Sequence, residues 1–507
     1  MDNGQQSLVT AGWILILAYM AVVLFFVIRG ARKSRSMQDY AVGSIAFSPI
    51  AVGLALAASM TSAATFIINP GFIALYGISG VISYALVLPA AAMISLVILT
   101  KGFRSYGSSV KALTMAQWMG NRYNSKGYSL FFAFLSLLLV TFIVLIVVGL
   151  VKVLSSALAI SEMAALIGIV LFIFGYMAFG GANSMVYTNT IQAILMLIVA
   201  FILLGSGYEH FSEGIHGFLG KLRAIDPNLV KWANPASFLF RDWFEIIFAQ
   251  LVVGVAIVCQ PHIITKSLLL KTDKDVNTYL IAGVITEVIF FAVVFAGLYA
   301  RLAFPDLTLN GAAIPMDGII SAYVVREFPV FVGLIVVMGL ISAGISTLEG
   351  LIQSVSTTIT KDIVEPLAKS KLPEDDGERD RILQKVNKAA IALLAIVSIW
   401  LSWNQLVSPK LSVAIFAQNG VYAYFSAAFL PILFGMFLKD VPKAAPIAAS
   451  ITAVVVHFTI SLGNIRIPFT QSSGQNPGVA ASVAIVLSVL VGGAIYLINR
   501  RKVDVPA

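Results

Sequence analysis

The stretch ALAASMTSAATFIINPG, residues 55–71, carries a pattern of small and hydroxyl residues that has two interpretations. Both of its ends are apolar, it stops at Pro70–Gly71, and four hydroxyl side chains lie between, namely Ser59, Thr61, Ser62 and Thr65. Because small residues are common where membrane helices pack closely, an intact and tightly packed helix is one interpretation. The alternative is a helix that unwinds near 58–62, where the freed backbone carbonyls bind a cation.

The composition of the whole chain places this stretch in a membrane protein. Of its 507 residues, 59% are hydrophobic and 11% are charged, with a mean hydropathy of +0.94. An ordinary soluble domain has about 25% charged residues, so a water-soluble globule is excluded. The single cysteine, Cys259, excludes intramolecular disulfides, thiolate zinc clusters and iron–sulfur ligation. The net charge is +9, but the basic residues are dispersed between apolar runs, which sets nucleic-acid binding aside.

Thirteen apolar runs approach the length of roughly 20 residues that crosses a bilayer as a helix. They lie at about 8–28, 46–69, 79–100, 128–151, 162–180, 186–206, 243–264, 277–300, 328–360, 387–403, 411–437, 443–462 and 480–499. Backbone polar groups cannot remain unpaired in lipid, so these spans are helical, and the alternation of an outer-membrane barrel is absent. The sequence therefore predicts an all-α polytopic membrane protein.

The distribution of Lys and Arg predicts the orientation. Most of these residues share one side if the loop after the first span, RGARKSR (29–35), is cytoplasmic. The N-terminus is then outside and the C-terminus is cytoplasmic, in a plasma (bacterial inner) membrane. The segment before the first span, MDNGQQS, lacks basic residues, so this span is predicted to be a retained helix and not a signal peptide.

Two extramembrane stretches have appreciable length. The outer one, 208–242, contains GIHGFLGKLRAID, which is compatible with a short amphipathic helix. The inner one, 361–388, contains PEDDGERDR and is predicted to be a solvated, mixed-charge hinge.

Two further spans contain residues that are unusual in a membrane helix. The span 243–264 ends in Cys259–Gln260–Pro261–His262, where the proline disrupts the preceding turn, and it lies five spans after the first flawed one. Transporters with inverted repeats place broken helices in such corresponding positions. The span 328–360 offers Ser346 and Thr347 near its centre. Each hydroxyl has two possible roles, a bond to its own helix or a ligand for a hard cation.

Three carboxylates lie within spans. Glu245 is near the outer end of its helix and is expected to reach water. Glu287 and Glu349 lie near mid-span, where a charge is costly, so each is expected to face a cavity or a partner. Neither has an obvious basic partner inside a predicted helix.

Enzyme chemistry has no support in this sequence. It shows no metal-enzyme cluster, no P-loop and no nucleophile–base motif, which argues against an enzyme and against an ATP-driven pump. No organic cofactor, nucleic acid or obligatory protein partner is indicated.

Several motifs, in the right order over nearly the whole chain, resemble the sodium:solute symporter family. They are FGGANSMVYTNTIQAILML (179–197), CQPHIITKS (259–267) and SAGISTLEGLIQSVSTTITKD (342–362). FIINPGFIALYG (66–77) and the run that starts at PDLTLNG (305–311) look most like its sodium/pantothenate branch.

This resemblance implies about 13 transmembrane helices with a LeuT-like 5+5 inverted-repeat core. One extra helix precedes the core and two follow it. The implied division is 1–45 for the extra N-terminal helix and its cytoplasmic loop, 46–207 for the first repeat, 208–242 for an extracellular loop, 243–437 for the second repeat with the cytoplasmic linker 361–388, and 438–507 for the two C-terminal helices and tail.

The resemblance also implies sites. Sodium would bind the backbone carbonyls of Ala58, Thr61 and Ala343 and the hydroxyls of Ser346 and Thr347. The solute would contact Ser62 and Thr65, with Tyr84, Gln260 and Gln418 as weaker candidates. Asn189 replaces an aspartate that supports a second sodium in some members, which favours coupling to one sodium. Glu349 stands where relatives carry a neutral polar residue, so it is a candidate second-ion or proton site, as is Glu287.

The function predicted is sodium-coupled import of a small organic solute, preferably a carboxylate such as pantothenate, by alternating access. A proton symporter that uses Glu349 or Glu287 is the alternative of the same general type. A solute-sensing membrane module and a passive channel are the alternatives from other classes.

Overall fold

The computed structural model describes residues 3–43, 47–110, 112–270, 272–309, 311–408, 412–468, 470–471 and 476–503. Within them, ten helical segments are long and apolar enough to cross a membrane, two pairs of helices do so as bent spans, and Glu162–Met177 is a shorter apolar helix. Each of the thirteen predicted runs coincides with one of these, so the predicted all-α membrane fold is confirmed.

Most spans are single helices. They are α1 (Asn3–Ala31), α10 (Glu162–Met177), α11 (Ala182–Gly205), α18 (Val330–Thr358), α20 (Asp376–Val407), α21 (Val413–Phe437), α22 (Ala444–Gly463) and α23 (Pro477–Val503). Three spans join two helices through a short π-helical or 3₁₀ segment: α5 (Ile78–Val81) with α6 (Leu88–Val110), α8 (Lys126–Leu135) with α9 (Val140–Leu158), and α15 (Asp273–Ala292) with α16 (Ala296–Ala303).

The two flawed spans are the bent ones. The first joins α3 (Pro49–Met60) to Ala64–Tyr76, which contains α4 (Asn69–Tyr76), at an angle of 56°. The second joins Phe244–Ile257, which contains α13 (Ala249–Ile257), to Pro261–Ser267, which starts with α14 (Pro261–Ile264), also at 56°. Gln260 is extended, with ψ of 136°, because a following proline disfavours the helical conformation. The prediction of an interruption near 58–62 is confirmed.

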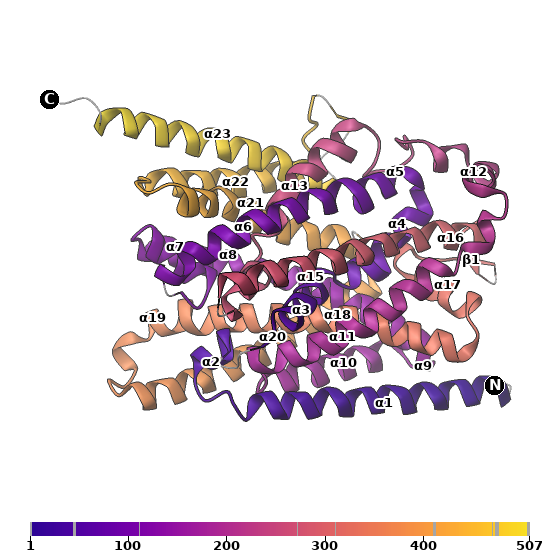
Figure 1. The fold of residues 1–507 in the computed structure, drawn as a ribbon, viewed down its shortest axis with the longest axis horizontal. Helices are drawn as coiled ribbons and strands as arrows, with labels where there is room; N and C mark the ends of the chain where they lie inside the picture. The colour runs from indigo at the N-terminus through magenta and orange to yellow at the C-terminus, as the bar shows by residue number, and fades with distance from the viewer. Residues whose placement is uncertain are drawn as a thin grey trace.

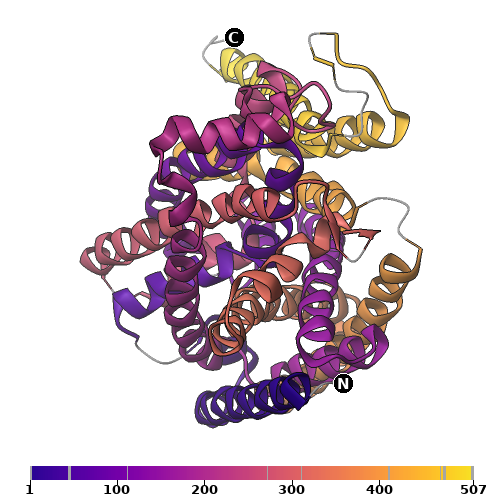
Figure 2. The ribbon, with the colours of Figure 1, turned by 90° about the vertical axis from the view of Figure 1, so that its right-hand side faces the viewer.

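The helices run side by side along the long axis of the molecule (Figure 1). Near one end lie α12 (Gly214–Ile225), α17 (Ile319–Glu327) and the antiparallel pair β1 (Thr308–Leu309) and β2 (Ala312–Ala313). Near the other end lie α2 (Met37–Val42), α7 (Met115–Arg122) and α19 (Glu365–Leu367). The view turned by 90° keeps α1 on one side of the bundle and α22 with α23 on the other (Figure 2).

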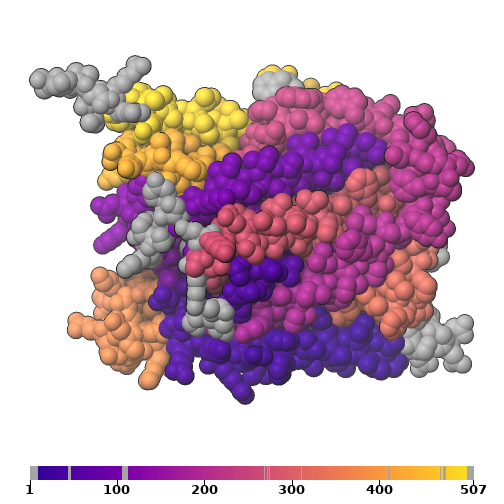
Figure 3. Space-filling view, viewed as in Figure 1, coloured from indigo at the N-terminus to yellow at the C-terminus, as the bar shows by residue number. Residues whose placement is uncertain are grey.

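The centre of the bundle is built around α3. This helix packs against α11, α15 and α18, and its residues from Val52 to Ser59 are almost all buried. In the space-filling view α1 and the C-terminal helices form opposite edges of the visible face (Figure 3). The interrupted end of α3 is therefore enclosed by protein, as an unwound backbone at membrane depth requires.

The extramembrane predictions have different outcomes. The segment 214–225 is indeed a helix, α12, with Phe218 and Leu222 buried. The prediction of a solvated hinge at 361–388 was wrong for most of that stretch, because α20 already begins at Asp376 and Glu365 pairs with both Lys361 and Arg379. Asp380 also accepts a hydrogen bond from the Met37 backbone nitrogen at 3.0 Å, which ties α20 to α2.

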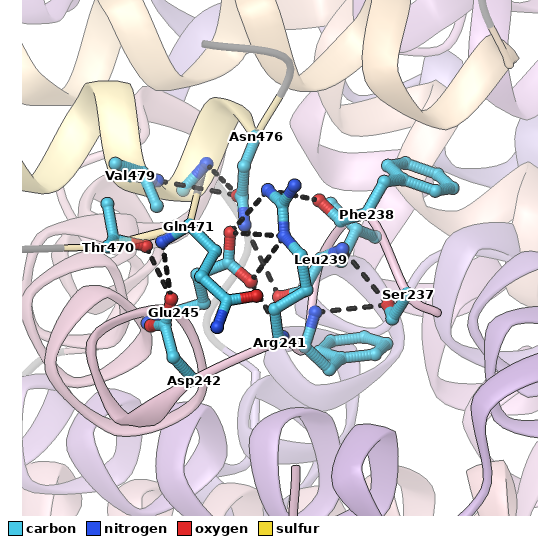
Figure 4. Close-up of polar contacts among 12 residues, drawn as sticks. Ser237, Phe238, Leu239, Arg241, Asp242, Glu245, Thr470, Gln471, Asn476 and Val479 are labelled. Carbon is cyan, nitrogen blue, oxygen red and sulfur yellow. Dashed lines mark hydrogen bonds and ion pairs between the residues drawn. The ribbon is translucent and has the colours of Figure 1, made fainter. Parts of the chain in front are cut away.

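The expectation that Glu245 reaches water was wrong as well. Its side chain is fully buried, 2.6 Å from the Arg241 guanidinium, at the start of the second bent span (Figure 4). Beside it, Asp242 accepts hydrogen bonds from the Thr470 hydroxyl and the Gln471 backbone nitrogen, both at 2.8 Å. The connection between α22 and α23 thus holds this span, and an ion partner one turn away removes the need for water.

Candidate functional site

The break that follows α3 faces two hydroxyl groups on α18. The Ser346 hydroxyl donates to the Ala58 carbonyl at 2.7 Å and lies 3.1 Å from the carbonyl of Ala343 on its own helix. The Thr347 hydroxyl lies 3.1 Å from the Ser59 carbonyl and 3.5 Å from the carbonyls of Ala58 and Ala343. Each hydroxyl therefore lies near a carbonyl of its own helix and near a carbonyl at the break, and its role as a cation ligand stays a prediction. We call this group of oxygens the oxygen cage.

The oxygen cage has the chemistry that a hard cation requires. Its donors are backbone carbonyls and hydroxyls, both neutral oxygen ligands, and all of the residues that supply them are buried. The structure brings together Ala58, Ala343, Ser346 and Thr347 of the predicted sodium set and adds the carbonyl of Ser59. Within the described part of the chain, no group of three or more His, Cys, Asp or Glu offers a rival metal site.

Thr61, the fifth predicted sodium ligand, makes a different contact with its side chain. Its hydroxyl donates to Glu287 on α15 at 2.6 Å, and the Glu287 side chain is fully buried. The other carboxylate oxygen of Glu287 is buried without a hydrogen-bond partner among the described residues. Glu287 therefore faces the interrupted segment from the side of α15, as expected for a mid-span carboxylate with a partner.

The five predicted solute residues line a single cavity of about 100 Å³ beside the same break. They are Ser62, Thr65, Tyr84, Gln260 and Gln418. Much of the remaining wall is apolar and includes Met60, Leu88, Phe142, Ile257 and Phe291. No Lys, Arg, Asp or Glu is among the described lining residues, so a solute here meets neutral polar groups.

Two polar groups in this cavity have unused hydrogen-bonding capacity. The Gln260 side-chain nitrogen donates to the Ile257 carbonyl at 3.1 Å, but its side-chain oxygen is buried without a partner among the described residues. Nδ1 of His262, which also lines the cavity, is likewise buried without a hydrogen-bond partner among the described residues. A buried polar atom without a partner is costly, which indicates a ligand or water in this position. His262 was not among the predicted solute residues, although its place after the predicted break was the available signal.

Glu349 has partners that the sequence did not reveal. Its carboxylate accepts hydrogen bonds from the hydroxyls of Tyr176 on α10 and Thr188 on α11, the latter at 2.7 Å. Lys266 lies in the same buried cluster, with 7% of its surface exposed. The search for a basic partner inside the predicted helices did not reach Lys266, which follows the break of the second bent span and points into the protein.

The fold has a counterpart among solved structures. A sodium-coupled sialic acid symporter, in a substrate-bound outward-open state, superposes with a TM-score of 0.74 at 17% sequence identity, over 95% of this chain and 98% of that chain. A manganese transporter of Eremococcus coleocola gives a TM-score of 0.51 at 13% identity, over 90% and 95%. The architecture is thus a LeuT-like fold.

The sequence identifies the family within this class. The profile of the sodium:solute symporter family matches residues 40–452, so the chain belongs to that family. Among its relatives, the sodium/pantothenate symporter of Escherichia coli strain K12 is 26% identical over 97% of this chain and 96% of its own length. Sodium/proline symporter 2 of Staphylococcus saprophyticus is 23% identical over 88% and 86%.

Proposed function

We propose that this protein imports a small organic carboxylate, such as pantothenate or another monocarboxylate, together with one sodium ion. The observation that carries the proposal is the convergence of the Ser346 and Thr347 hydroxyls on the carbonyls of Ala58 and Ser59 at the helix break. The similarity to two sodium/pantothenate symporters, each 26% identical in the aligned part, supports the choice of solute.

The neutral cavity can hold a carboxylate without a basic side chain. The Ser62 hydroxyl accepts a hydrogen bond from the Ala64 backbone nitrogen at 3.1 Å, so its own hydrogen is available to a solute oxygen. The helix Ala64–Tyr76 starts at this point, and the N-terminus of a helix is partially positive. Tyr84 and Gln418 line the same cavity and can supply further hydrogen bonds.

Sodium and solute are coupled because both use the same interrupted segment. Sodium would bind Ala58 on one side of the break, and the solute would contact Ser62 and Thr65 on the other. If each ligand favours the same arrangement of this segment, each raises the affinity for the other by the same factor. One sodium ion and one monocarboxylate together carry no net charge, so the sodium concentration gradient, and not the membrane potential, drives their import.

We assign the end of the bundle with α2, α7 and α19 to the cytoplasm of a bacterium (Figure 1). Arg32, Lys33 and Arg35 follow α1 at this end, in keeping with the excess of basic residues on the cytoplasmic side. The N-terminus is then outside. We assign 46–207 and 243–437 to the two inverted repeats because the bent spans occupy corresponding positions.

A reconstituted transport assay tests the proposal. Purified protein in liposomes should accumulate radiolabelled pantothenate only with an inward sodium gradient, and a thermal-shift screen with and without sodium should identify any other carboxylate. Accumulation that persists without sodium and collapses with a pH gradient would refute sodium coupling. A sodium-dependent stabilisation by a solute without a carboxylate would refute the solute class.

A further inference from the structure

Lys266 is a charged side chain in an environment built of oxygen atoms. It lies in the 3₁₀ segment Thr265–Leu269, directly after α14. Its ammonium donates to the Ala55 carbonyl at 2.9 Å and to the Ser59 hydroxyl at 2.6 Å, both on α3. A buried cation at this depth needs compensation from oxygen ligands and from an opposite charge.

Asn189 on α11 joins the ammonium to a carboxylate. With its amide oriented to satisfy all neighbours, its oxygen accepts from Lys266 at 3.3 Å and from the Ser59 hydroxyl at 2.9 Å. Its nitrogen then donates to Glu349 at 2.8 Å and to the side-chain oxygen of Gln192 at 3.0 Å. The ammonium therefore has a carbonyl, a hydroxyl and an amide oxygen around it, which are the kinds of ligand that an alkali ion takes.

Glu349 supplies the opposite charge in this cluster. Its carboxylate oxygens accept from Tyr176, Thr188 and Asn189, and its side chain is fully buried on α18. The pair is separated by a single amide group. We call Lys266, Asn189 and Glu349, with Ser59, the charged cluster.

The charged cluster and the oxygen cage share one residue. The Ser59 hydroxyl accepts from Lys266, whereas the Ser59 carbonyl accepts from Thr347 of the oxygen cage. A sodium ion in the cage would therefore lie one residue away from the ligands of the ammonium. At such a separation inside a protein, the interaction between two charges is large compared with thermal energy.

We propose that the Lys266 ammonium is a built-in cation that fills, beside the oxygen cage, the place of a second bound ion. It fixes the number of sodium ions at one and, with Glu349, sets the affinity of the cage. This inference rests on the proposed function, since it takes the oxygen cage to be the sodium site. Glu349 is then neither a free second-ion site nor a carrier of transported protons, because its counter-charge belongs to the chain itself.

A purely structural ion pair would behave differently. Removing either partner of a buried pair leaves one charge uncompensated and destabilises the protein in both cases. A built-in cation gives opposite effects on sodium. Without the carboxylate, the ammonium repels sodium from the cage, and without the ammonium, the carboxylate attracts sodium.

The test is equilibrium binding of ²²Na⁺ to the purified full chain at pH 7.0. The wild type should bind one ion per chain. Glu349→Gln should weaken sodium binding by about tenfold or more. Lys266→Met should strengthen sodium binding or raise the stoichiometry toward two, and Lys266→Met/Glu349→Gln should return within about threefold of the wild type. A shift of both single variants in the same direction, with a double variant equal to their sum, would overturn the proposal.

Control variants separate charge from folding. Lys266→Arg keeps the charge and should keep a stoichiometry of one. Lys266→Gln keeps a donor for Ser59 and replaces Lys266→Met if that variant does not elute as a single species. Lys152→Gln breaks another ion pair, with Glu162 at 2.5 Å on α9 and α10, and should change the sodium midpoint less than about twofold.

The same assay distinguishes this inference from the proposed function. If the wild type does not bind sodium, or if Ser346→Ala leaves binding unchanged, the assignment of the oxygen cage fails first. If the wild type binds one sodium through the cage and the two charge variants shift together, only the built-in cation is refuted.

Discussion

The oxygen cage and the charged cluster both use α3 and α18, and the cluster adds Asn189 of α11 and Lys266 of the segment after α14. The cage presents neutral carbonyls and hydroxyls from Ala58, Ser346 and Thr347. The cluster contains an amino group, on Lys266, and a carboxyl group, on Glu349. A sodium ion bound by the neutral oxygens of the cage can leave for the cytoplasm. The ammonium of Lys266 belongs to the chain and stays in the cluster. Neighbouring residues of the same helices can therefore bind a transported ion in one place and a side-chain cation in another.

The largest expected effect comes from removal of both cage hydroxyls. Ser346→Ala/Thr347→Ala deletes two oxygen ligands and should raise the sodium concentration for half-maximal uptake by about 100-fold, since hydrogen bonds to charged groups contribute about 1.5–3 kcal/mol each. The measurement is the sodium dependence of solute uptake in proteoliposomes.

Ser356→Ala is the matched control for the cage, because Ser356 is buried on the same helix and its hydroxyl bonds the Gln353 carbonyl at 3.2 Å. It should change the sodium midpoint less than about threefold. Equal effects of the two substitutions would mean that the cage hydroxyls only pack.

The contact between Thr61 and Glu287 pairs a neutral hydroxyl with a carboxyl group. It is intermediate in charge between the cage, which has only neutral groups, and the cluster, which has two ionisable ones. Thr61→Val removes the 2.6 Å hydrogen bond and leaves a buried carboxyl group unsatisfied. The variant should lose about 1–3 kcal/mol of stability, seen as a lower thermal unfolding temperature in detergent. Thr61→Val/Glu287→Gln should recover part of this loss, and an unchanged unfolding temperature in Thr61→Val would show that the bond contributes nothing.

The solute cavity should respond in solute affinity and not in stability. Gln260→Leu removes an amide whose oxygen is buried without a partner among the described residues, so the solute concentration for half-maximal uptake should rise by about tenfold. Gln250→Leu is the control, because Gln250 has a similar orphan oxygen in the same span but does not line the cavity. An identical response of the two variants would remove Gln260 from the solute site.

A further effect concerns a carboxyl group outside the membrane spans. Burial raises the pKa of Asp317 to about 6, although Lys152 opposes the shift. A raised pKa means that ionisation destabilises the fold, so stability should fall as pH rises from about 4 to 6 and stay level above that range. Asp317→Asn should therefore be more stable than the wild type at pH 7.5 by about 1–3 kcal/mol, and equal to it near pH 4. A variant that is less stable at pH 7.5 would contradict this account.

The membrane class, the thirteen spans and the positions of both breaks could be predicted from the amino-acid sequence. These properties are local, since they depend on the length of an apolar run and on a proline or a group of hydroxyls within it. The residues of the solute cavity also emerged from the sequence, though only through motifs that resemble a family. Ser59 was noted among the hydroxyls, but its carbonyl was missing from the predicted cage.

The proximity of Lys266 to Glu349 could be seen only in the tertiary structure. In the sequence, Lys266 follows the predicted span 243–264 and Glu349 lies within the span 328–360. Because the two residues are far apart in the chain, nothing in the sequence indicates that they are neighbours. The mutual packing of α3, α11 and α18 brings Asn189 and Ser59 to the place between Lys266 and Glu349. Glu245 is a different case, since its partner Arg241 is only four residues away and only its burial was missed. An ionic partner on another helix depends on how the spans pack against one another. The residue pattern within one span does not predict it.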